Sequence, residues 1–194
     1  VCLMQSLIMA VLSLNARMNM PFRGRFLLLS LIVAVLAGLS FAPGLPGEFV
    51  FDDIPNIVDN PGIQLHRLDG DGLARVMNAG QVSGFTRTLP TLTFALDFWR
   101  AGGTDPATFK TTNIVIQMLT ALALAGFFRS LFLVSGIAAM RAQWLALALA
   151  LAWAAHPLQV SSVLYVVQRL QTLGTLFLLL ALWAYLNARQ TQIE

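Results

Sequence analysis

Two adjacent carboxylates, Asp52 and Asp53, are the residues whose types and spacing most suggest chemistry. They lie in the segment EFVFDDIPNIVDNP, residues 48–61, which follows the first long apolar run. A carboxylate just outside a membrane span can take a proton from an attacking hydroxyl or bind a metal, and burial tunes its pKa. A lone pair of acids is a weak motif. The alternative is a solvated loop whose aspartates begin a short interfacial helix, with Pro55 in its first turn.

The composition indicates an integral membrane protein. Hydrophobic residues make up 57% of the 194 residues and charged residues only 11%, whereas a soluble domain carries about 25% charged residues. The mean hydropathy is +0.73. The formal net charge of +3 comes from 11 arginines and one lysine without a basic cluster, which favours membrane topology and phosphate handling over nucleic-acid binding. Cys2 is the only cysteine, so no intramolecular disulfide can form.

Four apolar segments predict an all-α membrane protein with about four transmembrane helices, because a helix needs about 20 mostly apolar residues to cross a bilayer. The predicted spans are residues 26–42, 111–129, 140–156 and 171–187. Together with their connections they form one membrane domain over residues 26–189. Residues 1–25 form an N-terminal segment that is either an interfacial helix or, the interpretation we favour, upstream sequence included by a misplaced start, with Met18 or Met20 as the natural beginning. Residues 190–194 form a tail.

Residues 43–110 are predicted to form one long water-facing loop. Eight of the nine acids lie in it: Glu48, Asp52, Asp53, Asp59, Asp69, Asp71, Asp97 and Asp105. The loop is expected to hold a short helix at residues 72–80 and an amphipathic helix at residues 86–99 that lies along the membrane surface. The apolar face of the second helix consists of Leu92, Leu96 and Trp99, and Asp97 lies off that face.

The basic residues orient the chain with its N-terminus inside. This orientation places six of them on the cytoplasmic side: Arg17, Arg23, Arg25, Arg129, Arg141 and Arg189. Six lie on the other side, but five of these belong to a loop longer than the roughly 60 residues over which the positive-inside rule is counted. We therefore expect the acidic loop to be exoplasmic, on the periplasmic side of a bacterial inner membrane.

Three blocks of sequence carry a resemblance to a known family. They are FVFDDIPNIVDNP, RTLPTLTFALDFWRAGGTDPATFKTTNIVIQMLTAL and HPLQVSSVLYVVQRLQTLGTLFLLLALWAYL. Their order and their placement against the spans resemble the membrane proteins that combine a GT-C-type glycosyltransferase domain with TPR repeats, the protein O-mannosyltransferase type. The chain has fewer spans than such enzymes and no 34-residue repeat. The resemblance therefore covers an N-terminal portion only, with further spans and TPR repeats missing.

The resemblance implies a polyprenyl-phosphate sugar as donor, in contact with membrane lipid, and a protein acceptor. Mannose or a related sugar would be transferred to a Ser or Thr hydroxyl. Asp52 and Asp53 match the acidic pair of the family, so one of them would be the base, or the ligand of a divalent metal if one is used.

Four further residues are candidates for binding the donor phosphate. Arg87 and Arg169 are favoured because a guanidinium fork suits a phosphate, and Lys110 and His156 follow. For the arginines and the lysine, the alternative is anchoring at the membrane surface. For His156, which precedes a proline, it is a residue at a helix end.

Two departures from the family pattern favour a second interpretation of the chain. Gln117 stands where a histidine is usual, one turn after Asn113, and Ser161 or Ser162 replaces a common acid. The chain can therefore also be a non-catalytic membrane module or a degenerate fragment that packs on a partner, with Asn113 and Gln117 bonding between helices. A transporter segment is a further alternative, although the spans carry almost no charge. We expect the aspartates to lie near Arg87 or Arg169, and this chain alone to be inactive.

Overall fold

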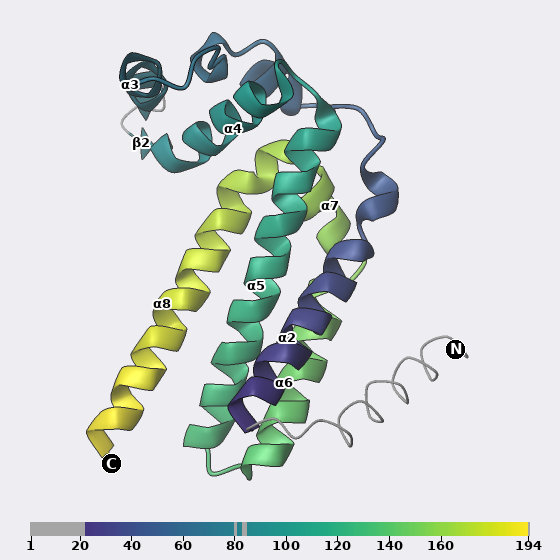
Figure 1. Ribbon diagram of the computed structural model, residues 1–194, viewed down its shortest axis with the longest axis vertical. Helices are drawn as coiled ribbons and strands as arrows, with labels where there is room; N and C mark the ends of the chain where they lie inside the picture. Colours follow the sequence, from purple (N-terminus) through teal and green to yellow (C-terminus); the bar gives the residue numbers. More distant parts are fainter. Residues whose placement is uncertain (1–21, 80, 83–84, 194) are drawn as a thin grey trace.

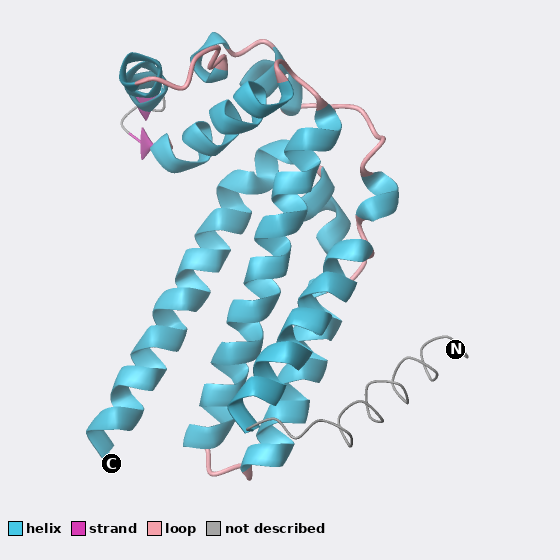
Figure 2. Cartoon of the chain, viewed as in Figure 1, coloured by secondary structure: helices cyan, strands magenta, loops and turns pink. Residues whose placement is uncertain are grey.

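The computed structural model describes residues 22–79, 81–82 and 85–193, and the described chain is almost entirely helical (Figures 1 and 2). The predicted N-terminal segment and the start at Met18 or Met20 lie outside the described residues. Four helices form the bundle: α2 (Phe22–Leu39), α5 (Pro106–Val134), α6 (Ala139–Ala154) and α8 (Arg169–Ile193). Two strands of two residues each, β1 (Gln81–Val82) and β2 (Phe85–Thr86), pair antiparallel in the loop.

The predicted class, an all-α membrane protein, is confirmed. Within the described part of the chain, three helical stretches are long and apolar enough to cross a membrane: Gly24–Gly44, Pro106–Val134 and Val166–Arg189. The fourth apolar helix, α6, has only 16 residues. It ends before His156 because the following proline lacks a backbone N–H and disfavours helical geometry in the residue before it. A separate short helix, α7 (Gln159–Leu164), follows this break.

Helix α5 is the central member of the bundle and packs against α2, α6 and α8. Alanines line these interfaces, including Ala37, Ala121 and Ala150, which have no exposed surface. Small side chains let helices approach closely, which is how membrane helices gain packing contacts in the absence of a hydrophobic driving force. Close approach of the helix backbones therefore holds the bundle together.

The described residues between 43 and 105 form a packed cap on one end of the bundle, which we call the loop end (Figure 1). The cap contains α3 (Gly70–Ala79) and α4 (Thr88–Ala101), near the two predicted loop helices. Its core combines loop residues with Phe109 of α5 and Val166 of the turn before α8: Ile57, Ile63, Leu65, Val76, Phe94, Ala95, Phe98, Phe109 and Val166. Because this core continues into the bundle, the cap has a fixed position on it.

The prediction for the faces of α4 needs a correction. Leu96 and Trp99 are exposed, whereas Asp97 is buried together with Phe94 and Phe98. Sequence periodicity places Asp97 off the apolar face, but an acid can be buried where it meets a cation. That cation is described below.

Labelling of introduced cysteines tests the membrane topology. Gly70 is exposed at the loop end, and Ser135 is exposed just after α5, at the other end of that 29-residue helix, which is about 43 Å long at 1.5 Å per residue. In a Cys2→Ser background, Gly70→Cys and Ser135→Cys should react with a membrane-impermeant maleimide from opposite sides. Reaction of both from the same side would contradict a crossing by α5.

A glycine substitution tests the packing of α8 on α5. A Cβ at Gly126 would lie 2.5–2.8 Å from ring atoms of Trp183, so even an alanine forces the two helices apart. Gly126→Ala should lower the free energy of unfolding by about 1–3 kcal/mol, as overpacking does, measured by denaturant titration in detergent. Gly174→Ala is the matched control, because nothing lies within 4 Å of its Cβ position. Equal stability of the two variants would show that the Trp183 contact does not hold α8.

Candidate active site at the loop end of the helix bundle

The two aspartates have different surroundings. Asp53 has no exposed surface, and its carboxylate accepts hydrogen bonds from the backbone N–H groups of Val167 (2.7 Å), Val50 (3.3 Å) and Val166 (3.4 Å). Asp52 is exposed, and within the described residues its carboxylate makes no hydrogen bond or ion pair. Of the pair, only Asp52 therefore presents free oxygen lone pairs to an incoming group.

Local helical structure places the pair. Asp53 precedes a π-helical turn, η2 (Ile54–Val58), with Pro55 near its start. The short helix expected in the alternative interpretation of this segment is therefore present. Its aspartates, however, do not cap it with their side chains, because the Asp53 carboxylate is directed to the segment before α8.

Burial raises the pKa of the Asp53 carboxyl above its ordinary value. The hydrogen bonds from Val167, Val50 and Val166 and the positive charge of Lys110 act in the opposite direction and favour the carboxylate. Desolvation is the largest of these effects. Asp53 is thus a buried acid that its backbone donors hold in place.

Lys110 is almost fully buried and holds the segment that follows α2. Its Nζ donates to the carbonyl oxygens of Gly47 (2.5 Å) and Gly44 (3.3 Å). A Cβ at Gly47 would lie 2.8 Å from this Nζ, so a side chain there would displace the end of the lysine. The ammonium, predicted to bind the donor phosphate, has backbone carbonyls as its neighbours here.

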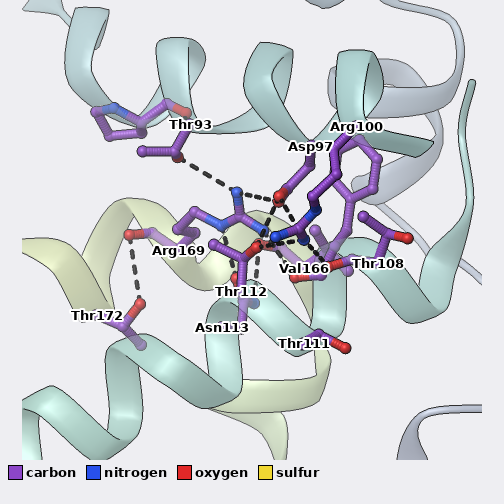
Figure 3. A network of polar contacts seen from close by, with 12 residues as sticks. Thr93, Asp97, Arg100, Thr108, Thr111, Thr112, Asn113, Val166, Arg169 and Thr172 are labelled. Atoms are coloured by element: carbon purple, nitrogen blue, oxygen red, sulfur yellow. Dashed lines mark hydrogen bonds and ion pairs between the residues drawn. The ribbon is translucent and has the colours of Figure 1, made fainter. Parts of the chain in front are cut away.

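Arg169 is the centre of a buried polar network (Figure 3). Its guanidinium has no exposed surface and forms an ion pair of 2.7 Å with Asp97. It also donates to Asn113 Oδ1 (2.6 Å), the Phe109 carbonyl (2.7 Å) and Thr93 Oγ1 (3.3 Å). The guanidinium carbon lies 4.5 Å from the centroid of the Phe94 ring, within reach of a cation–π interaction.

The partners of Arg169 are themselves linked. Asp97 Oδ1 accepts hydrogen bonds from Thr112 Oγ1 (2.6 Å) and Arg100 Nη2 (3.0 Å). Asn113 donates to the carbonyls of Val163 (3.0 Å) and Val166 (3.3 Å). The network thus joins α4, α5, α7 and the start of α8. A phosphate could reach Arg169 only by displacing these partners, so the structure gives this arginine an architectural role.

Arg87 is the exposed cation among the predicted phosphate ligands. It lines a cavity of about 130 Å³ between the cap and the start of α8. The other lining residues are Asn56, Asn60, Ile63, Ala79, Thr91, Phe94, Val167 and Leu170. Asn56 lies one turn after Asp52, and its amide donates to the Asp52 carbonyl (2.7 Å). The cavity therefore begins next to the aspartate segment.

The aspartate segment and the residues before Arg169 meet through backbone groups, while convergence of the side chains themselves stays a prediction. The Asp53 carboxylate accepts a hydrogen bond from the N–H of Val167, which lies 114 residues later in the sequence. Val167 is two residues before Arg169. Val167 also lines the cavity that contains Arg87. The aspartate segment, Arg87 and the approach to Arg169 thus belong to one region, although no hydrogen bond or ion pair joins the described side chains of Asp52 or Asp53 to either arginine.

The polar residues near the break after α6 form hydrogen bonds with backbone groups at that break. His156 is exposed, and its Nδ1 accepts from the Leu158 N–H (3.2 Å). Gln117 donates to the Ala154 carbonyl (2.9 Å), which α6 leaves free where it ends. Among residues 22–79, 81–82 and 85–193, no group of three or more His, Cys, Asp or Glu side chains is placed to hold a metal ion. A metal at Asp52 or Asp53 stays a prediction.

The comparisons with known proteins give matches to protein O-mannosyl-transferases, the type of protein that the three sequence blocks resemble. No family model and no solved structure matches the chain. It is 32% identical over 173 residues to protein O-mannosyl-transferase TMTC4 of Homo sapiens, covering 81% of this chain and 23% of that protein. It is 32% identical over 165 residues to protein O-mannosyl-transferase TMTC1 of Homo sapiens, covering 78% of this chain and 17% of that protein. The chain thus spans under a quarter of these relatives, and over most of its own length it resembles a part of the protein O-mannosyl-transferases.

Proposed function

We propose that this chain is part of a glycosyltransferase that moves mannose or a related sugar from a polyprenyl-phosphate donor to a Ser or Thr hydroxyl of a protein. The names of its relatives support sugar transfer to protein. The observation that carries the proposal is the exposed, unpaired carboxylate of Asp52, whose backbone carbonyl accepts a hydrogen bond from Asn56 in the lining of the cavity that contains Arg87.

In this reaction the acceptor oxygen attacks the anomeric carbon, and the bond between that carbon and the phosphate oxygen breaks. Asp52 accepts the proton of the hydroxyl, because its carboxylate is the one with free lone pairs. Polyprenyl phosphate leaves with its negative charge, and Arg87 at the cavity edge stabilises that charge with its guanidinium fork. If a divalent metal takes part, Asp52 is again the carboxylate with oxygens available to it.

Asp53, Lys110 and Arg169 have a supporting role in this proposal. Asp53 fixes the acidic segment to the backbone before α8, and Lys110 fixes the segment after α2. Arg169 holds α4 over the bundle. The loop end would face the exoplasmic side, where the donor sugar and the acceptor meet, and the polyprenyl tail would lie in membrane lipid.

A transfer assay with the complete gene product in membrane vesicles tests the proposal. Polyprenyl-phosphate mannose and a panel of other polyprenyl-phosphate sugars serve as donors, and Ser- and Thr-containing polypeptides as acceptors. Transfer that depends on Asp52 is the expected result, with chelator added in parallel to report on a metal. No transfer from any donor would favour a second candidate, a membrane module that packs on a partner. The small buried share of the apolar window in Val166–Arg189, 11%, supports that candidate.

A further inference from the structure

The segment that follows α7 contacts the backbone N–H of Asp52 and the carboxylate of Asp53. Tyr165 is extended (φ −84°, ψ 108°) between α7 and the 3-10 turn η4 (Val166–Gln168). Its hydroxyl accepts a hydrogen bond from the Asp52 N–H at 3.0 Å. The next two residues, Val166 and Val167, donate their N–H groups to Asp53. Three consecutive residues therefore hold Asp52 and Asp53 from one side.

The residue before Asp52 has an unusual backbone. Phe51 has φ +47°, in the left-handed region, and is the only described non-glycine residue with positive φ. This conformation costs a bulky L-residue about 1–2 kcal/mol. Phe51 is also 82% exposed, so burial of its side chain does not hold it there. Some other contact must maintain the conformation.

Tyr165 supplies one such contact, in addition to the Asp53 N–H, which donates to the Val50 carbonyl at 3.0 Å and closes the turn. Its ring meets the Phe51 ring edge to face, with centroids 6.5 Å apart, while its hydroxyl binds the next backbone N–H. The left-handed residue turns the chain immediately before Asp52, and the bonds to Asp53 fix the chain immediately after it. The Asp52 side chain is left exposed between these two fixed points.

We propose that Tyr165 is a positioning residue for Asp52: its hydroxyl and ring hold the left-handed turn at Phe51 and thereby direct the Asp52 carboxylate outward. The catalytic consequence rests on the proposed function, whereas the structural part does not. Removal of the hydroxyl takes away one of the contacts that hold the turn, so the carboxylate is less firmly directed. A misplacement of this kind lowers turnover without removing the base.

The test uses Tyr165→Phe in the complete protein, because this change removes the hydroxyl and keeps the ring. Hydrogen exchange should become about 2–10-fold faster in the peptide containing residues 50–53, which corresponds to a lost hydrogen bond of about 0.5–1.5 kcal/mol. We expect kcat to fall roughly tenfold, with KM nearly unchanged. Tyr185→Phe is the matched control, because Tyr185 is the other tyrosine and is exposed on α8.

A second variant separates positioning from general stability. Glycine adopts positive φ without strain, so in a Phe51→Gly background Tyr165→Phe should lower kcat by less than in the natural background. Unchanged exchange at residues 50–53 in Tyr165→Phe would overturn the inference. So would faster exchange across the whole protein, which would give the hydroxyl a general structural role only.

The outcomes distinguish this inference from the proposed function. If Asp52→Asn abolishes transfer while Tyr165→Phe matches the natural protein in exchange and kcat, the positioning role is wrong and the transferase role stands. If the natural protein transfers no sugar, the proposed function is wrong, and the exchange measurement alone decides whether Tyr165 holds the turn.

Discussion

Asp52→Asn should lower turnover of the complete protein by roughly 10²–10⁴, the range expected for loss of a general base. The substitution keeps the shape of the side chain and removes its charge and basicity. Because Asp52 is exposed and its carboxylate has no partner among the described residues, the free energy of unfolding should stay within about 0.5 kcal/mol of the natural protein. Initial rates of sugar transfer and denaturant titration in detergent measure the two effects.

Asp53→Asn is the informative comparison because it changes the same chemical group in a buried place. Its carboxylate accepts three backbone hydrogen bonds. An amide has one oxygen and an NH₂ group, so at least one of these donors loses its acceptor. Leaving a buried donor unsatisfied costs about 1–3 kcal/mol. The expected pattern is therefore loss of turnover with normal stability for Asp52→Asn, and loss of stability for Asp53→Asn. The reverse pattern would make Asp53 the base.

The sequence could not assign these separate roles. The two acids are adjacent, have the same chemistry and match the same position of the family pattern. What separates them is contact with Val166 and Val167, more than a hundred residues later. No periodicity or spacing encodes a pairing of that kind. The helices on either side of the pair, by contrast, were predictable, because apolar length and amphipathic spacing are local properties of the chain.

Asp97 is a second residue whose environment could not be predicted from local sequence patterns. Its place off the apolar face of residues 86–99 predicts a solvated acid, yet the structure buries it beside Arg169. A local sign was present, since Arg100 lies three residues later and pairs with Asp97. This spacing indicates an exposed ion pair within one helix. The buried partner of Asp97 is Arg169, which lies in another helix. An acid between Phe94 and Phe98 in a largely apolar helix is the local feature that indicates a distant cation.

Asp97→Asn should have the largest effect on stability, about 3–5 kcal/mol, because it leaves the Arg169 guanidinium buried without a counter-charge. Both side chains are almost fully buried, with 0% of Arg169 and 5% of Asp97 exposed. The remaining partners of Arg169 are neutral, namely Asn113, Thr93 and the Phe109 carbonyl. They satisfy its N–H groups but cannot balance its charge. Denaturant titration of the purified protein in detergent measures the loss.

Asp69→Asn is the matched control for this prediction. Asp69 pairs with Arg67 at 3.5 Å, but 45% of the Asp69 side chain and 84% of the Arg67 side chain are exposed. An exposed pair contributes only about 0–1 kcal/mol. A loss of similar size in both variants would contradict a special role for the buried pair. So would a stability for Asp97→Asn equal to that of the natural protein.

A double substitution decides what the buried pair is for. Combining Asp97→Asn with Arg169→Met removes the unbalanced charge and keeps much of the apolar volume, so part of the lost stability should return. Transfer activity should not return with it. Arg169 bonds Asn113, and Asn113 holds the Val166 carbonyl, while the Val166 and Val167 N–H groups hold Asp53. A double variant that regains stability and stays inactive would show that the ion pair positions the acidic segment, whereas full recovery of transfer would limit the pair to stability.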